Sequence, residues 1–322
     1  MKDQWSYWSL LFAVIGEGDR LDLRYGQELQ GIQYAEKCDA CSPHGCCGNG
    51  PVSHAVICME SSMRPWILAE TNYYHVKDCE YQVAVLPMGA TEPHNLHLPY
   101  GTDTLESEAI GSRVCEAAWN GGARVILLPA IPYGTQTNQS RCRLSMNVNP
   151  ATLGTVLRDL IDSLAGHGIL KLVILNSHGG NEFKPLLREF HGSTPVQLFL
   201  CDWFRGLTHD VQQKLFESPG DHAGEMETAL GLAFFEHLVR RNEDGTIAAD
   251  DGTVRETQFN AVNEGWVSIT RPWHLLTSNT GVGNPHPATA EKGEALMKVI
   301  VERLSAFLIQ LAESPLDGQF PF

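Results

Sequence analysis

The fold is decided by one continuous stretch, Val83-Ala-Val-Leu-Pro-Met-Gly-Ala-Thr-Glu-Pro-His-Asn-Leu-His-Leu-Pro-Tyr-Gly-Thr-Asp103. Its first part, residues 83–88, is a short apolar run of the length and composition of a buried strand. Its last part, residues 92–103, packs two carboxylates and two imidazoles into twelve residues. Such groups bind Zn²⁺, Mn²⁺ and similar ions, and open α/β sheets present their chemistry beyond the strand ends, so we expect the active site to begin here.

The rest of the chain from Met63 onward alternates short apolar runs with amphipathic stretches. The apolar runs predict buried strands at 82–88, 123–128, 170–175 and 196–201, and a further strand is expected at 264–270. The amphipathic stretches predict helices at 104–119, 151–166, 183–190, 224–240 and 288–312. This alternation is typical of an α/β fold with a mainly parallel central sheet and helices on its faces.

Composition excludes several classes of protein. The 322 residues include 38 acidic and 23 basic side chains, a net charge of −15, which argues against a nucleic-acid or anionic-membrane partner. No apolar run is long enough to span a bilayer, and the apolar start of the chain lacks the features of a signal peptide. A cytoplasmic location is therefore the expectation.

Residues 1–62 read differently from the remainder, because they show no sustained apolar period. We expect a peripheral N-terminal extension, disordered or the product of an upstream start site with Met63 as the true initiator, followed by one catalytic domain over 63–322. Five of the nine cysteines lie in the extension. Residues 38–47 contain Cys-x-x-Cys, a histidine and two further cysteines, so a zinc-binding regulatory module is an alternative there.

Two further clusters carry metal-capable side chains. Residues 176–181, Asn-Ser-His-Gly-Gly-Asn, follow a predicted strand, and the paired glycines allow a tight turn that presents His178 at the sheet edge. Residues 221–228, Asp-His-Ala-Gly-Glu-Met-Glu-Thr, begin a predicted helix. Because positions two apart on a helix do not face each other, only one of Glu225 and Glu227 is expected to serve as ligand or base.

Each cluster taken alone also fits a structural interpretation. Residues 92–103 could be a polar surface loop, His178 a hydrogen-bonded core histidine, and the acids at 221–227 a helix start that favours the helix dipole. Their conjunction favours one shared site, because all three combine carboxylates or imidazoles with turn-forming glycines.

At these residues the chain resembles the creatininase, or creatinine amidohydrolase, family. The family's opening motif, approximately Glu-x-His-Gly-x-His-Leu-Pro followed by Thr-Asp, is matched over 92–103. Its second motif, Asn-Gly-His-Gly-Gly-Asn, is matched at 176–181, and its third, His-Ala-Gly-Glu-x-Glu-Thr, at 222–228. The resemblance covers about residues 64–312. It implies a layered α/β/α fold, a homo-oligomer for which a hexamer is one expectation, and two divalent metal ions, Zn²⁺ and/or Mn²⁺.

Carried over by position, the resemblance implies four metal ligands: Glu92, His94, Asp103 and His178. Asp103 is the expected bridge between the ions. Creatininase itself has a further ligand, a glutamate, at the position of Gly180, and in members with Gly-Gly, as here, Glu225 is expected to take that place. A second departure is Asn138-Gln139, where many members have a Glu-His pair. Both departures argue against creatinine as the substrate.

The function implied is a metal-dependent hydrolase of a non-peptide C–N bond in a small amide or cyclic amide, through attack of a metal-bridging hydroxide. Glu227 or His222 is expected to protonate the leaving nitrogen, and His97 to orient a ligand or the substrate from behind. The open alternatives are a formamide hydrolase of flavin or deazaflavin biosynthesis, a peptide-processing relative, and a non-catalytic metal- or ligand-binding protein on the same scaffold.

Overall fold

The structure, a computed structural model, describes residues 63–322 except 219. The chain divides into two units, Met1–Met59 and Glu60–Phe322, and the described residues belong to the second. The predicted N-terminal extension, with its alternative zinc module, lies outside the described residues.

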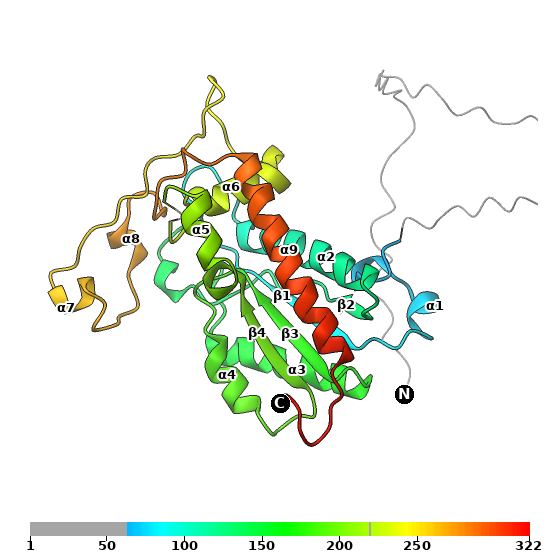
Figure 1. Ribbon diagram of the computed structural model, residues 1–322. Coiled ribbons are helices and arrows are strands. Elements are labelled where there is room, and N and C mark those ends of the chain that lie inside the picture. The colour runs from blue at the N-terminus through cyan, green and yellow to red at the C-terminus, as the bar shows by residue number, and fades with distance from the viewer. Residues whose placement is uncertain (1–62, 219) are drawn as a thin grey trace, which may run out of the picture. The chain divides into compact units, whose positions relative to one another are not determined.

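A four-stranded parallel sheet forms the centre of the described unit, with strand order β2-β1-β3-β4 (Figure 1). The strands are β1 (Val83–Met88), β2 (Val125–Leu127), β3 (Lys171–Asn176) and β4 (Gln197–Asp202). The two central strands, β1 and β3, are buried along their whole length, which explains why apolar residues occupy both of their faces. The predicted α/β fold with a parallel sheet is confirmed.

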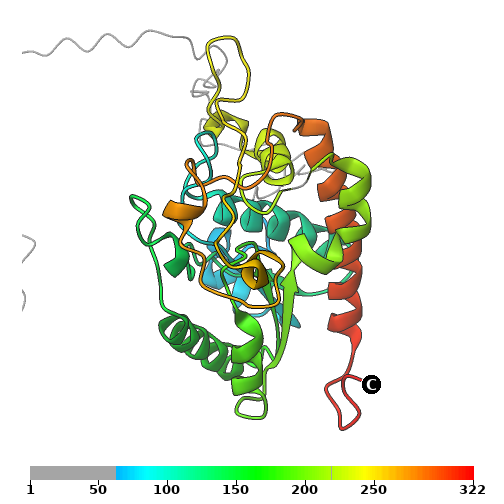
Figure 2. The ribbon, with the colours of Figure 1, turned by 90° about the vertical axis from the view of Figure 1, so that its left-hand side faces the viewer.

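Helices cover both faces of the sheet. On one face Val85 and Val173 join a core with the long helices α2 (Thr102–Asn120), α6 (Glu225–Phe234) and α9 (Ala290–Glu313). On the other face Leu86 and Ile174 join a second core with α3 (Pro150–Gly166) and α4 (Phe183–Phe190). Figure 2 shows the orange-to-red α9 on one side of the strands and the green α3 and α4 on the other. Each fully buried aliphatic side chain in these two cores contributes about 1.5–3 kcal/mol to the stability of the fold.

Shorter helices complete the part of the chain that the structure describes: α1 (Tyr73–Val76), α5 (His209–Leu215), α7 (Asn260–Asn263) and α8 (Trp273–Leu276). Short 3₁₀ turns add Leu68–Glu70, Thr137–Gln139 and Glu236–Leu238, and Trp203–Leu207 is a single π turn after β4. No helix among the described residues is long and apolar enough to cross a membrane.

Two sequence-based expectations are wrong. The helix expected at 224–240 ends at Phe234, because Phe235 leaves helical backbone angles (φ −146°, ψ 43°) and buries its ring in the core. The strand expected at 264–270 does not form. Its apolar side chains are exposed, with Trp266 81% accessible, so this segment gains no partner strand and no core.

The carboxyl ends of β1 and β3 lie side by side, because the parallel register pairs Met88 with Asn176. The loop that carries Glu92 and the turn that carries His178 therefore leave the sheet at the same edge. Gly89 allows the start of α2 to approach this edge, since a Cβ there would lie 2.7 Å from the backbone of Thr104. The first two predicted clusters are brought together in this way.

The third cluster reaches the same edge through the packing of α6 against α9. A Cβ at Gly293 of α9 would collide with the Ala229 carbonyl oxygen of α6, so this glycine allows the two helices to cross closely. The N-terminus of α6, with residues 222–227, is thereby held beside the ends of β1 and β3.

Candidate metal centre

Four buried side chains meet beyond the ends of β1 and β3. His178 Nδ1 lies 3.0 Å from Glu92 Oε1 and 3.1 Å from Asp103 Oδ2. His94 Nε2 lies 3.0 Å from the other oxygen of the same carboxylate, Asp103 Oδ1. Asp103 therefore stands between two imidazoles, with one oxygen facing each. All four side chains were predicted as ligands, and each is at most 4% exposed.

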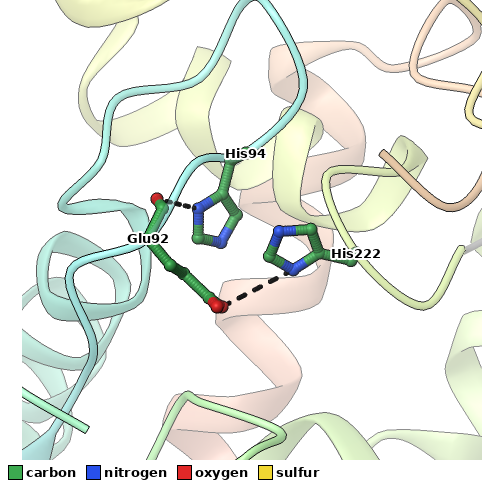
Figure 3. A group of neighbouring side chains, drawn as sticks. All are labelled: Glu92, His94 and His222. Atoms are coloured by element: carbon green, nitrogen blue, oxygen red, sulfur yellow. Dashed lines mark hydrogen bonds and ion pairs between the residues drawn. The ribbon is translucent and has the colours of Figure 1, made fainter. Parts of the chain in front are cut away.

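His222 joins this cluster from the segment before α6. Its Nδ1 lies 3.7 Å from Glu92 Oε1, and its ring stacks against that of His94 with centroids 4.1 Å apart (Figure 3). The edge of Trp273 closes its other side, with centroids 4.7 Å apart. The third predicted cluster thus shares the site with the first two.

Backbone carbonyls fix which nitrogen each histidine presents to the cluster. His94 Nδ1 donates to Glu92 O (3.0 Å), His178 Nε2 to Thr135 O (3.1 Å) and His222 Nε2 to Pro93 O (2.9 Å). A carbonyl can only accept, so in each neutral ring the remaining nitrogen has a free lone pair that faces the carboxylates. An imidazole held in this way by a backbone carbonyl is the usual arrangement of a metal-binding histidine.

The turn at His178 is built to hold that ring. The Asn176 side chain accepts from His178 N (3.2 Å) and donates to His178 O (2.9 Å), and Asn181 Nδ2 donates to Asn176 Oδ1 (3.1 Å). A Cβ at Gly180 would lie within 2.5 Å of both the Thr135 carbonyl oxygen and His178 Nε2. The hydrogen bond that orients His178 therefore needs the space that Gly180 leaves.

The electrostatics of the cluster favour a bound cation. Burial opposes ionisation of Glu92 and Asp103, yet the pKa of each carboxyl is below its usual value because the imidazoles of His178 and His94 stand beside them. Burial also disfavours charge on the rings, but the carboxylates outweigh it and raise the pKa of His94 to about 9 and that of His178 well above its usual value. The metal-free cluster therefore holds protons that a metal ion would displace.

Three groups of described side chains could each hold a divalent cation: Glu92, His94 and His222 form one group, and the other two groups share Asp103. One ligand atom each from Glu92, Asp103 and His178 lies within 4.8 Å of the others, and so does one each from His94, Asp103 and Glu227. Ligands about 2.0–2.2 Å from a common ion stand roughly 3–3.5 Å apart, which matches the nitrogen–oxygen distances of 3.0–3.1 Å. Glu92 Oε2 is buried without a hydrogen-bond partner among the described residues, a costly condition that a cation relieves.

Glu225 does not lie in this cluster, contrary to the ligand role expected for it. Its fully buried carboxylate accepts from the backbone N–H groups of Glu217 (2.8 Å) and Ser218 (3.0 Å), and it is paired with Lys292 Nζ at the start of α9. These contacts hold the N-terminus of α6 in place. The expectation that Glu225 is the remaining ligand thus disagrees with its position.

Glu227 is the acid of α6 that faces His94 and Asp103. Its carboxylate accepts from Ala223 N, a residue in the left-handed backbone region (φ 50°). Burial raises the pKa of Glu227 to about 7, and the nearby His94 opposes that rise. We expected Glu227 to act as a proton donor. Its position beside His94 and Asp103, two predicted ligands, suits a further ligand instead.

His97 lies behind the cluster, bonded to α6 rather than to a ligand. Its Nε2 donates to Thr228 Oγ1 (2.8 Å), whose own hydroxyl proton goes to Gly224 O (2.6 Å). Burial lowers the pKa of His97 to about 4, so the ring is neutral. This contact ties the loop after β1 to the first turn of α6.

Sequence reasoning missed a buried carboxyl on α2. Glu106 is 1% exposed, and neither of its side-chain oxygens has a partner among the described residues. Burial, Glu227 and Asp103 all raise its pKa well above the usual value of a glutamate. The sequence could have indicated this residue, because Glu106 lies three positions after Asp103 and therefore on the same face of the helix.

A cleft of about 410 Å³ opens onto the cluster. Besides the predicted ligands, it is lined by further polar and aromatic side chains: Gln139, Arg205, Gln212, Arg271 and Trp273. Of these, only Gln139 carried a signal in the sequence, as part of the departure at 138–139. The cleft can admit a small molecule to the carboxylates and imidazoles.

Comparisons with known proteins show the family of this chain. The family model described as creatininase, creatinine amidohydrolase, matches residues 69–308. The creatinine amidohydrolase of Pseudomonas putida is 26% identical over 247 residues, which are 71% of this chain and 88% of that protein. The mycofactocin precursor peptide peptidase of Mycobacterium ulcerans is 25% identical over 246 residues, 73% of this chain and 87% of that protein.

Solved structures show the same architecture. A putative creatinine amidohydrolase from Bacteroides fragilis superimposes with a TM-score of 0.72 at 35% identity, and the match covers 79% of this chain and all of that one. A manganese creatininase and a creatininase variant of Zn-Zn type, each 23% identical, give TM-scores of 0.59 and 0.61. Each of these two matches covers 78% of this chain and all of the other.

Proposed function

The chain belongs to the creatininase family, and on that premise we propose that it is a metal-dependent hydrolase of a non-peptide C–N bond in a small amide or cyclic amide. The observation that carries this proposal is the sharing of Asp103 between two groups of potential ligands at the buried end of an open cleft. The relatives add support, since their names describe hydrolysis of creatinine or of a peptide.

The residues that would hold the metal ions fall into two groups around Asp103. Glu92 and His178 would complete one site, and His94 and Glu227 the other. Manganese and zinc are the candidates, because two solved creatininases are described with these metals and the donors are oxygen and imidazole nitrogen. Bound there, such ions lower the pKa of water and polarise an amide carbonyl.

His222 also lies within ligand distance of Glu92 and His94, but with Glu227 in the second group we assign proton transfer to His222. Its Nε2–H is committed to Pro93 O, and burial and the charge of His94 lower its pKa, so Nδ1 carries a free lone pair at neutral pH. In hydrolysis the hydroxyl of water adds to the carbonyl carbon, the C–N bond breaks, and the leaving nitrogen takes a proton. His222 Nδ1 is placed to take a proton at the first stage and return it at the last.

Peptide processing is the second candidate, because relatives with that activity match over nearly the same length as creatinine amidohydrolase does. Creatinine itself is disfavoured. Thr135 and His178 lie so close to Gly180 that the glutamate expected at this position in creatininase would not fit, so the environment of the second metal group differs.

Metal analysis combined with a substrate panel tests the proposal. The purified protein is assayed on small amides, lactams, formamides and short peptides, with and without chelator, beside His178→Ala and the surface control His191→Ala. We expect about two metal ions per chain and chelator-sensitive turnover of a non-peptide amide, both lost in His178→Ala. Turnover of peptides alone would select the second candidate. Full turnover and metal content in His178→Ala would reject the site.

A further inference from the structure

The cleft has two chemically different ends. At the buried end lie the carboxylates and imidazoles of the metal centre. Toward solvent lie two guanidinium groups, those of Arg205 and Arg271, whose side chains are 49% and 46% exposed. Arg205 comes from the π turn after β4, and Arg271 from the segment before α8. Two segments far apart in the sequence thus place guanidinium groups at one opening, which Asp221 also lines.

Both arginines retain unused hydrogen-bond donors. Arg205 makes one ion pair, 3.5 Å to Asp202, and that carboxylate also accepts from Asn176 Nδ2 (2.8 Å). Arg271 makes one hydrogen bond, 3.0 Å to the exposed Asp221. A guanidinium has five N–H donors, and exposed ion pairs of this kind are weak, so each arginine can bind a further anion.

The oxygen of a buried side-chain amide in the cleft lining also lacks a partner. Gln139, which lines the cleft, is 1% exposed, and its Oε1 has no hydrogen-bond partner among the described residues. The Oε1 of Gln136, three residues earlier, also lacks a partner, but Gln136 does not line the cleft, and its Nε2 donates to the carbonyl oxygens of Thr91 (2.9 Å) and Met146 (2.5 Å). A buried acceptor without a donor is a position that a ligand N–H can fill.

Resting on the proposed function, we propose that the substrate is an amide that carries a carboxylate. The scissile amide lies at the metal centre, its N–H donates to Gln139 Oε1, and the carboxylate binds Arg205 and Arg271. A carboxylate matches the planar fork of a guanidinium. The overall charge of −15 repels anions, so an anionic substrate needs local N–H donors, and the unused donors of these two arginines supply them at the opening, in competition with the weak ion pairs to Asp202 and Asp221.

The test uses matched pairs of ligands that differ only in the anionic group. The N-formyl derivatives of glycine, alanine and phenylalanine are each compared with the corresponding N-formyl carboxamide, on the full-length zinc-loaded protein. Binding is measured by calorimetry at low salt, and kcat/KM wherever turnover occurs. We expect at least one acid to bind about tenfold or more tightly than its carboxamide.

The variants locate that preference. Arg205→Gln and Arg271→Gln should each weaken acid binding about tenfold and leave carboxamide binding unchanged. Arg241→Gln is the matched control, because Arg241 makes a comparable surface ion pair with Glu236 (2.8 Å) and does not line the cleft. Gln139→Leu should weaken both members of a pair equally, since Gln139 faces the group that they share.

The outcomes separate this inference from the proposed function. Equal binding of acid and carboxamide, no binding of either, or equal losses in all three arginine variants would overturn the anionic site. Hydrolysis of acids and carboxamides alike would keep the hydrolase and reject the anionic site. Arginine-dependent binding of acids without turnover of any amide would keep the anionic site and reject the hydrolase.

Discussion

Replacement of Gly180 by alanine should weaken metal binding, although the new methyl group touches no ligand atom that would coordinate the ion. The added Cβ would lie within 2.5 Å of both Thr135 O and His178 Nε2. Non-bonded atoms rest about 3.5–4 Å apart, so the ring or the carbonyl must move by roughly 1 Å. The backbone at this glycine is not in the left-handed region, so space alone decides the effect.

The magnitude follows from the hydrogen bond that the displacement breaks. The distance from His178 Nε2 to Thr135 O, 3.1 Å, would lengthen beyond hydrogen-bond range. The orientation of the ring, which holds Nδ1 between Glu92 and Asp103, would then no longer be fixed. Loss of such an outer partner costs about 10- to 100-fold in metal affinity. We therefore expect Gly180→Ala to bind zinc about 10- to 100-fold more weakly, which is about 1.4–2.7 kcal/mol.

The assay is competition for zinc with a chromogenic chelator, accompanied by circular dichroism to verify the fold. Gly179→Ala is the matched control, because a Cβ at Gly179 meets no atom within 4 Å. Wild-type affinity in Gly180→Ala would refute the reasoning. So would an equal loss in both alanine variants.

Three further predictions concern the neighbouring side chains. Glu227→Gln replaces a proposed ligand and should lower zinc affinity at its site by more than about tenfold, the smallest loss expected for an outer partner, with little change in unfolding. Glu225→Gln breaks a buried ion pair and should lower the urea unfolding free energy by about 3 kcal/mol and leave zinc affinity unchanged. The reverse pattern would restore the ligand role of Glu225. Zinc binding at pH 7.5 should release protons, because the pKa of His94 is about 9 and its ring must lose a proton before it binds metal; calorimetry in buffers of different ionisation enthalpy measures the number, and zero release contradicts the prediction. Burial lowers the pKa of His97 to about 4, against about 6.5 in the unfolded chain. The unfolded state therefore binds this proton more readily, and the metal-free protein should lose about 2 kcal/mol of stability from pH 7 to pH 5 through this ring; His97→Asn should remove that loss, and the exposed control His191→Asn should keep it.

Much of the fold, and the meeting of Glu92 with His178, could be predicted from local sequence patterns. Residues 83–88 and 171–176 are apolar on both faces, which specifies buried parallel strands, and glycines follow each strand where the chain must turn. Once these strands are neighbours in a parallel sheet, the side chains that follow them must meet at one edge. For that reason the local pattern is enough to place Glu92 and His178 together.

The choice between Glu225 and Glu227 could not be made locally. Helical geometry requires that only one of them face the site, and this holds. Which one does so depends on Lys292, a residue 67 positions away that pairs with Glu225 from the start of α9. The cleft arginines pose the same difficulty, because Arg271 directly follows residues 264–270, which were expected to form a strand and do not.

The absence of a side chain at Gly180 and the position of Glu227 are two parts of one arrangement. Where creatininase is expected to carry a glutamate after its second-motif histidine, this chain uses the space for the contact between His178 and Thr135. The acid that accompanies His94 and Asp103 comes instead from α6, and the place of α6 is fixed by Gly293 at its crossing with α9. A larger residue at 293 should therefore disturb the metal centre mainly through Glu227, and leave the group of Glu92, Asp103 and His178 able to bind one ion. One zinc per chain in Gly293→Ala, against two in the wild type, is the expected result; two retained ions would show that the position of Glu227 does not depend on this crossing.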